Sequence, residues 1–191
     1  MSSGKRRKRL LLQLLLGGGD RRSIGKSNQV AARVLRHPRE FAALLACLWS
    51  GDPLVRMRAA DALEKISCQR PALLAPFKAE LLGLAEEATQ SELRWHLAQM
   101  LPRLPLAAPE RNRAVALLRL YLRDRSSIVK TTALQAFFDL AREMPSLEQE
   151  VADLLESASR TGTPAMRARS RNLLRQFHSK SRARVAGQFA P

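Results

Sequence analysis

The sequence predicts an all-α protein, a solenoid of about five stacked helix pairs, and two observations lead to this prediction. First, Ala, Leu, Arg and Glu dominate a chain of 191 residues in which aromatic residues make up only 5%, a composition that favours helix over strand. Second, a helix-sized segment returns four times in the same register, with copies 38, 36 and 37 residues apart. A period of this length indicates helix pairs that stack in one direction rather than a single closed core.

The four copies align on a basic residue that borders an apolar stripe. The basic residues are Arg56, Arg94, Lys130 and Arg167. Apolar residues stand one place before and seven and ten places after each of them: Val55, Leu63 and Ile66; Leu93, Leu101 and Leu104; Val129, Phe137 and Leu140; Met166, Leu174 and Phe177. These spacings fall on one side of a helix, so the stripe predicts the buried face of the second helix in each pair.

Start and stop signals place the other helices. We expect helices over residues 5–16, 24–36, 38–49, 52–67, 71–88, 90–104, 109–123, 126–143, 146–160 and 163–178. Asp52 and Thr163 each stand before a proline, which places a capping side chain ahead of a residue suited to the first helical turn. Three glycines, Gly17–Gly19, are expected to end the first helix.

Charge divides the chain into three parts. The net charge is +16, but residues 1–26 hold eight Lys or Arg against one acidic residue, and residues 160–191 hold eight with none. We therefore expect a basic N-terminal segment with a short apolar helix over 1–19, a nearly neutral repeat solenoid over 20–178, and a basic, disordered tail over 179–191.

The segment GDPLVRMRAADALEKI, which begins at Gly51, resembles the second helix of a HEAT repeat, with its Asp-Pro turn, Val-Arg pair, small residues and closing aliphatic residue. The resemblance covers residues 20–178 and is weaker at Ser91 and Ser126, where the Asp-Pro turn is missing. Similarity to HEAT-repeat (armadillo-type) proteins implies a right-handed superhelix whose second helices line the concave side. It also implies a structural role in the stack for Asp52 and for the basic residues at the aligned position, which would bond to neighbouring repeats. It implies no particular ligand.

Three polar ladders run along the second helices, two, five and nine places after the basic residue. They are Arg58, His96, Thr132 and Arg169; Asp61, Gln99, Gln135 and Asn172; Lys65, Arg103, Asp139 and Gln176. Because every member is polar, we expect this face to be solvated, and the family geometry would make it the lining of the groove. Trp95 and Phe138 also lie off the stripe, where they either pack between repeats or form an exposed anchor for a peptide.

These features favour a non-enzymatic interaction scaffold that binds a protein or peptide partner on the concave face. The alternative is nucleic-acid binding through the basic ends, with Arg58, Arg103 and Arg169 on phosphates. HEAT-like repeats also build DNA-alkylation-repair glycosylases, although Asp61, Asp139, Trp95 and Phe138 match no motif of such an enzyme. HEAT-like chromophore lyases share only the repeat with this chain.

We expect no catalytic residue, cofactor or metal. Cys47 and Cys68 are predicted to be buried reduced thiols, since the three histidines do not complete a zinc site. The segment GDRRSIGKS approaches the phosphate-binding loop, but five residues instead of four separate Gly19 from Gly25.

We expect a cytoplasmic monomer. The apolar run Leu10–Leu16 contains Gln13, is followed by no clear cleavage site, and is far shorter than the roughly 20 residues that span a bilayer.

Overall fold

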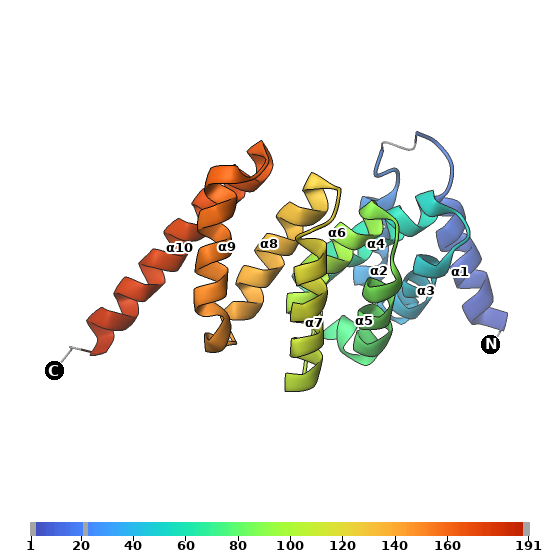
Figure 1. Ribbon diagram of the computed structural model, residues 1–191. Helices are drawn as coiled ribbons and strands as arrows, with labels where there is room; N and C mark the ends of the chain where they lie inside the picture. Colours follow the sequence, from blue (N-terminus) through green and yellow to red (C-terminus); the bar gives the residue numbers. More distant parts are fainter. Residues whose placement is uncertain (1–2, 21–22, 189–191) are drawn as a thin grey trace. The chain divides into compact units, whose positions relative to one another are not determined.

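The structure, a computed structural model, describes residues 3–20 and 23–188, and every regular element in these ranges is helical (Figure 1). The prediction of an all-α protein is therefore confirmed. The chain forms two compact units, Met1–Ala107 and Ala108–Pro191, which are described separately.

Unit 1 contains six α-helices interrupted by short 3-10 helices within the described residues. In chain order they are α1 (Ser3–Leu16), α2 (Ser27–Arg36), η1 (Pro38–Glu40), α3 (Phe41–Leu45), η2 (Ala46–Trp49), α4 (Pro53–Gln69), η3 (Pro71–Phe77), α5 (Lys78–Glu87), α6 (Ser91–Met100) and η4 (Leu101–Arg103). The second helices α2, α4 and α6 pack in a row, while α3 and η2 pack on α4 and α5 packs on α6. This is the stacked-pair arrangement that the repeats predict.

Three of the expected helices in unit 1 contain 3-10 turns. The expected helix over 38–49 is η1, α3 and η2 in succession, that over 71–88 begins as η3, and that over 90–104 ends as η4. Pro76 lies inside η3 and Pro102 inside η4. A proline lacks the amide hydrogen that an α-helical turn requires, so the chain tightens into i to i+3 turns around it.

Helix α1 is part of the packed unit, although it lies outside the predicted repeat array. Leu12 and Leu16 are fully buried, and α1 packs against α2, α3, α4 and η2. The helix ends where the glycines predict, because Gly18 and Gly19 have φ of +69° and +76°, the left-handed conformation that glycine adopts without strain.

Unit 2 contains two helix pairs. Its described elements are α7 (Ala108–Tyr121), α8 (Ser127–Ala141), η5 (Pro145–Leu147), α9 (Glu148–Thr161) and α10 (Pro164–Gln188). Helix α8 packs against α7, α9 and α10, and α9 lies beside α10 (Figure 1).

The last helix is longer than the sequence predicts. We expected it to end near residue 178, but α10 continues to Gln188, so most of the predicted disordered tail is helical and only 189–191 lie outside the described residues. Residues 179–188 contain no proline, and six of the ten are Ala, Arg, Lys or Gln, which favour helix.

The apolar stripe is buried in the first three copies. Its residues on α4, on α6 and the turn that follows it to Leu104, and on α8 are all buried. In the last copy Met166, Leu174 and Phe177 are only half-buried. Helix α4 packs between α2 and α6, whereas α10 packs against α8 and α9, which agrees with the lower burial of the last stripe.

Candidate binding surfaces

Arg58 of α4 forms hydrogen bonds to the loop between α1 and α2. Its side chain is only 2% exposed. The guanidinium donates hydrogen bonds to four backbone carbonyls, those of Leu16 (2.8 Å), Gly18 (2.6 Å), Asp20 (2.7 Å) and Ser23 (3.0 Å). The expectation that Arg58 lies on a solvated face is therefore wrong, because the preceding loop folds over it and supplies carbonyl acceptors in place of water.

Three of the four aligned basic residues donate hydrogen bonds to backbone carbonyls in the turn before their own helix. Arg56 donates to the carbonyls of Ser50 (2.7 Å) and Gly51 (3.2 Å), Arg94 to that of Ala88 (2.6 Å), and Arg167 to that of Gly162 (2.9 Å). One of them also reaches the next repeat, since Arg56 Nε donates to Gln90 Oε1 at 3.1 Å. Lys130, at the same position of α8, is half-buried. Each of these three arginines thus bonds to the turn before its own helix, and Arg56 also bonds to the following repeat.

Asp52 caps α4 in the way the sequence suggests. Its Oδ1 accepts a hydrogen bond from the Leu54 amide at 2.8 Å, and Pro53 occupies the first helical position. The corresponding Thr163 hydroxyl lies 3.4 Å from the Met166 amide, a longer contact.

Side chains of α2, α4, α6 and η4 form a surface of mixed charge in unit 1, which we call the unit 1 polar surface. Its members are Asn28, Asp61, Glu64, Lys65, Trp95, His96, Gln99 and Arg103. Lys65 Nζ donates to Asp61 Oδ2 (2.5 Å) and to Asn28 Oδ1 (2.6 Å). Asp61, itself buried, also accepts from the Ser27 hydroxyl at 2.5 Å. These bonds link two adjacent second helices.

The next link joins η4 to α4. Arg103 Nη1 donates to Glu64 Oε1 at 2.8 Å and to the Ser67 hydroxyl at 2.6 Å. Each cation of the unit 1 polar surface is thus paired with a carboxylate of α4: Lys65 with Asp61 and Arg103 with Glu64. The sequence placed these residues on one face, but it did not show that they pair.

His96 is a buried member of this surface. It is 7% exposed, and its Nδ1 has no hydrogen-bond partner among the described residues. Burial lowers the pKa of His96, and the negative charges of Asp61 and Glu64 partly oppose this effect. The expectation of solvation is wrong for His96 and Asp61, while Trp95, whose ring lies 5.5 Å from the His96 ring, stays half-buried.

In unit 2, a chain of hydrogen bonds links the predicted ladder residues of α8 and α10. Gln135 Nε2 donates to the Asp139 carboxylate at 3.0 and 3.1 Å, and Gln135 Oε1 accepts from Arg169 Nη1 at 3.0 Å.

The other ladder residues of unit 2 bond within their own helices. Thr132 donates to the Ile128 carbonyl and Gln176 to Asn172. Phe138 is 4% exposed and therefore packs inside the unit, so an exposed aromatic pair with Trp95 does not form.

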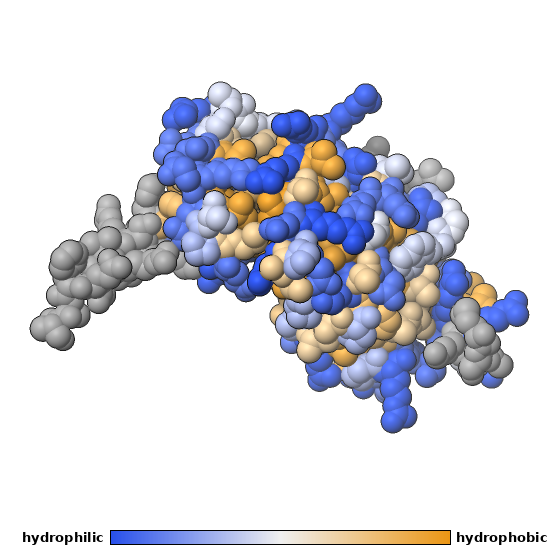
Figure 2. All heavy atoms as spheres, turned by 60° about the horizontal axis from the view of Figure 1, so that its bottom comes forward, coloured by the Kyte–Doolittle hydropathy of each residue, from blue (hydrophilic) through white to orange (hydrophobic). Residues whose placement is uncertain are grey.

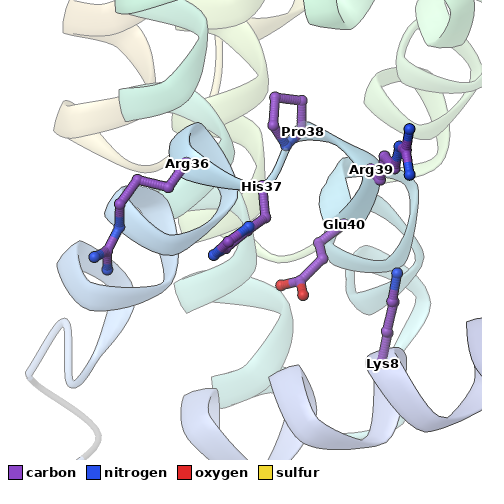
Figure 3. A pocket seen from close by; sticks show the side chains of 6 residues that line it. All are labelled: Lys8, Arg36, His37, Pro38, Arg39 and Glu40. Carbon is purple, nitrogen blue, oxygen red and sulfur yellow. The ribbon is translucent and has the colours of Figure 1, made fainter.

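A basic cavity of about 330 Å³ lies where α1 meets the corner between α2 and α3 (Figure 3). It is lined by Lys8, Arg36, His37, Pro38, Arg39 and Glu40. Glu40 is already paired, because Arg33 Nε and Nη2 donate to its two oxygens at 2.6 and 2.8 Å. This bidentate bond lowers the pKa of Glu40. The remaining cationic side chains come from segments far apart in the sequence, and sequence analysis did not bring them together.

The two cysteines differ in their exposure. Cys47 is buried, and burial raises its pKa to about 11, whereas Cys68 is exposed, which corrects the expectation that both are buried. Within the described part of the chain, no three residues among His, Cys, Asp and Glu are grouped to hold a metal ion.

Within each unit the helix pairs pack in chain order with their second helices side by side, and this arrangement defines a helical-repeat protein of the α-solenoid class. The model of one family, the HEAT repeat domain, matches residues 20–177. The chain belongs to the HEAT-repeat family. No curated protein matches it. Helix α1 precedes the matched residues.

Proposed function

We propose that this HEAT-repeat scaffold is not an enzyme and that it binds a protein or peptide partner through its second helices, with the unit 1 polar surface as the contact area. The observation that carries the proposal is the pairing of Lys65 with Asp61 and of Arg103 with Glu64. A surface whose cations are neutralised by neighbouring carboxylates offers little attraction to a polyphosphate, but it suits the mixed charges of a protein.

Trp95 and Gln99 supply the direct contacts in this proposal. Both are half-buried on α6, beside the ion pairs. Tryptophan is enriched among the residues that dominate binding energy at protein interfaces. Gln99 uses its amide nitrogen to donate to the Trp95 carbonyl at 3.2 Å, which leaves its carbonyl oxygen to accept from a partner.

Nucleic-acid binding in the groove is the weaker alternative. Arg58 is buried on four carbonyls and Arg103 is paired with Glu64, so two of the three arginines proposed to hold phosphates are engaged elsewhere. Arg169 is exposed and has a hydrogen bond to Gln135.

Site-specific photo-crosslinking tests the proposal. A photoreactive residue at Gln99 is expected to capture a discrete protein from the cells that make this chain, and the product is expected to disappear in Trp95→Ala. The matched control carries the same group at Glu80, an exposed residue of the first helix α5. Equal capture from both positions would contradict a specific surface.

A second arm addresses nucleic acid. Anisotropy of labelled duplex and single-stranded oligonucleotides is followed with the full chain at low and near-physiological salt. We expect any binding at low salt to vanish at the higher salt, because contacts to phosphates release counterions. Affinity that survives would place nucleic-acid binding ahead of the scaffold proposal.

A further inference from the structure

Helix α1 presents arginines and leucines on the side opposite its packed face. Leu12 and Leu16 mark the packed face, since both are fully buried. The exposed residues on the opposite side are Arg6, Arg7, Leu10, Leu11 and Leu14. At the helical advance of about 100° per residue, these five lie within an arc of about 140°. We call this surface the α1 docking face.

The leucines of the α1 docking face are unusually open to water. Leu10 is 51% exposed, Leu11 41% and Leu14 76%. They are three of the seven large hydrophobic residues described as exposed, the others being Ile24, Trp49, Leu120 and Ile128. Figure 2 shows one side of the molecule, where hydrophobic surface is visible between polar residues. Three exposed leucines on one side of a helix form an apolar patch of the kind that marks an interaction site.

Positive charge adjoins these leucines. Arg6 and Arg7 lie one turn before them, and α1 contains no acidic residue. Lys8, also exposed on α1, lines the basic cavity together with Arg36 and Arg39 (Figure 3). The one carboxylate of that cavity, Glu40, is held by Arg33. Lys8 also acts on Glu40 electrostatically, so the positive charge of the α1 docking face itself comes from Arg6 and Arg7.

We propose that the α1 docking face binds the surface of an anionic phospholipid bilayer. Helix α1 lies along the interface, its leucines enter the boundary between headgroups and acyl chains, and Arg6 and Arg7 contact headgroup phosphates. The contact is peripheral, since no helix in the described residues combines the length and apolar character that crossing a bilayer requires.

Charge and shape favour a bilayer over other partners. A nucleic-acid backbone would satisfy the arginines but leave three leucines in water. A second copy of this chain would bring like charges together. A bilayer provides both an anionic plane and an apolar layer beneath it, and it covers the outer side of a helix without needing a groove.

Vesicle flotation with the full chain tests the inference. The probes are vesicles of phosphatidylcholine alone and vesicles that also contain phosphatidylglycerol, at low and near-physiological salt. We expect binding to the anionic vesicles only. Leu11→Gln combined with Leu14→Gln should lower that affinity by about tenfold or more, and each of Arg6→Gln and Arg7→Gln by about fivefold.

Matched variants control for general effects. Leu120→Gln removes a leucine of α7 that is 65% exposed, and Arg171→Gln removes an exposed arginine of α10; both should bind like the wild type. Circular dichroism should show that all variants stay folded, because the replaced side chains are exposed.

Three results would overturn the inference: no binding to anionic vesicles, equal binding by the leucine variants, or an equal loss with Leu120→Gln. An acidic amphipathic peptide serves as competitor, and binding of that peptide without binding of vesicles would assign the face to a protein instead. The inference does not rest on the proposed function, because α1 lies outside the unit 1 polar surface. Its failure would leave crosslinking at Gln99 unaffected.

Discussion

The guanidinium group of Arg58 lies against the backbone of Gly25. A Cβ atom at Gly25 would come 2.6 Å from Cζ of Arg58, and Gly25 has φ of +53°. The arginine projects from α4 into the loop between α1 and α2, and the absence of a side chain at Gly25 leaves it the room to reach four carbonyls. The hydrogen bonds of Arg58 hold the loop that joins α1 to α2 against α4.

Arg58→Met should lower the free energy of unfolding by at least about 2 kcal/mol, because it removes a buried side chain that donates to four backbone carbonyls of the loop. Urea unfolding followed by circular dichroism measures the change. Arg169→Met is the matched control: Arg169 is exposed, and the loss there should stay below about 0.5 kcal/mol. Similar losses at the two positions would show that the carbonyl contacts contribute little.

Gly25→Ala should destabilise the protein by about 1–2 kcal/mol, since alanine disfavours the left-handed conformation and its methyl group meets the Arg58 guanidinium. Gly51→Ala should be nearly neutral, because a Cβ there meets nothing within 4 Å. In the double variant Gly25→Ala with Arg58→Met, the loss should be smaller than the sum of the two single losses. Strict additivity would contradict the contact.

Glu40→Gln should cost more stability than Glu150→Gln. Both carboxylates accept two hydrogen bonds from an arginine, Glu40 from Arg33 and Glu150 from Arg119. The side chain of Glu40 is 9% exposed, whereas that of Glu150 is 37% exposed. We expect a loss of about 1–3 kcal/mol for Glu40→Gln and below about 1 kcal/mol for Glu150→Gln, measured by urea unfolding. The reverse order would be inconsistent with burial as the cause.

His96 should make stability fall as the pH is lowered. Burial lowers the pKa of His96 in the folded state below the ordinary value of 6.5. As the pH falls below 6.5, the unfolded chain therefore takes up the proton before the folded chain does, and this uptake favours unfolding. The folded state is therefore most favoured above 6.5, and stability is lost as the pH falls towards the lowered pKa. Unfolding curves at about pH 7.5 and about pH 5.5 measure the loss.

His96→Gln should reduce this pH dependence, while His37→Gln, which changes an exposed histidine, should leave it intact. If His96→Gln has the same pH profile as the wild type, another group is responsible.

The periodic sequence alone determined the helical class, the order of the repeats and their buried stripe. Val55, Leu63 and Ile66 recur at helical spacing, and a run of this kind buries one side of a helix whatever its neighbours are. The Asp52-Pro53 start was equally readable, because a helix cap depends on residues next to one another in the chain.

Only the tertiary structure decided which polar residues meet water. Arg58, Asp61 and His96 share a polar side of the second helices, yet all three are buried, because loops and helices distant in sequence fold against them. The same holds for α1, whose seven-residue apolar run gave no sign of which leucines would pack and which would stay exposed. Local periodicity fixes the direction of a side chain from its helix axis, whereas its burial and its partners depend on segments that arrive from elsewhere in the chain.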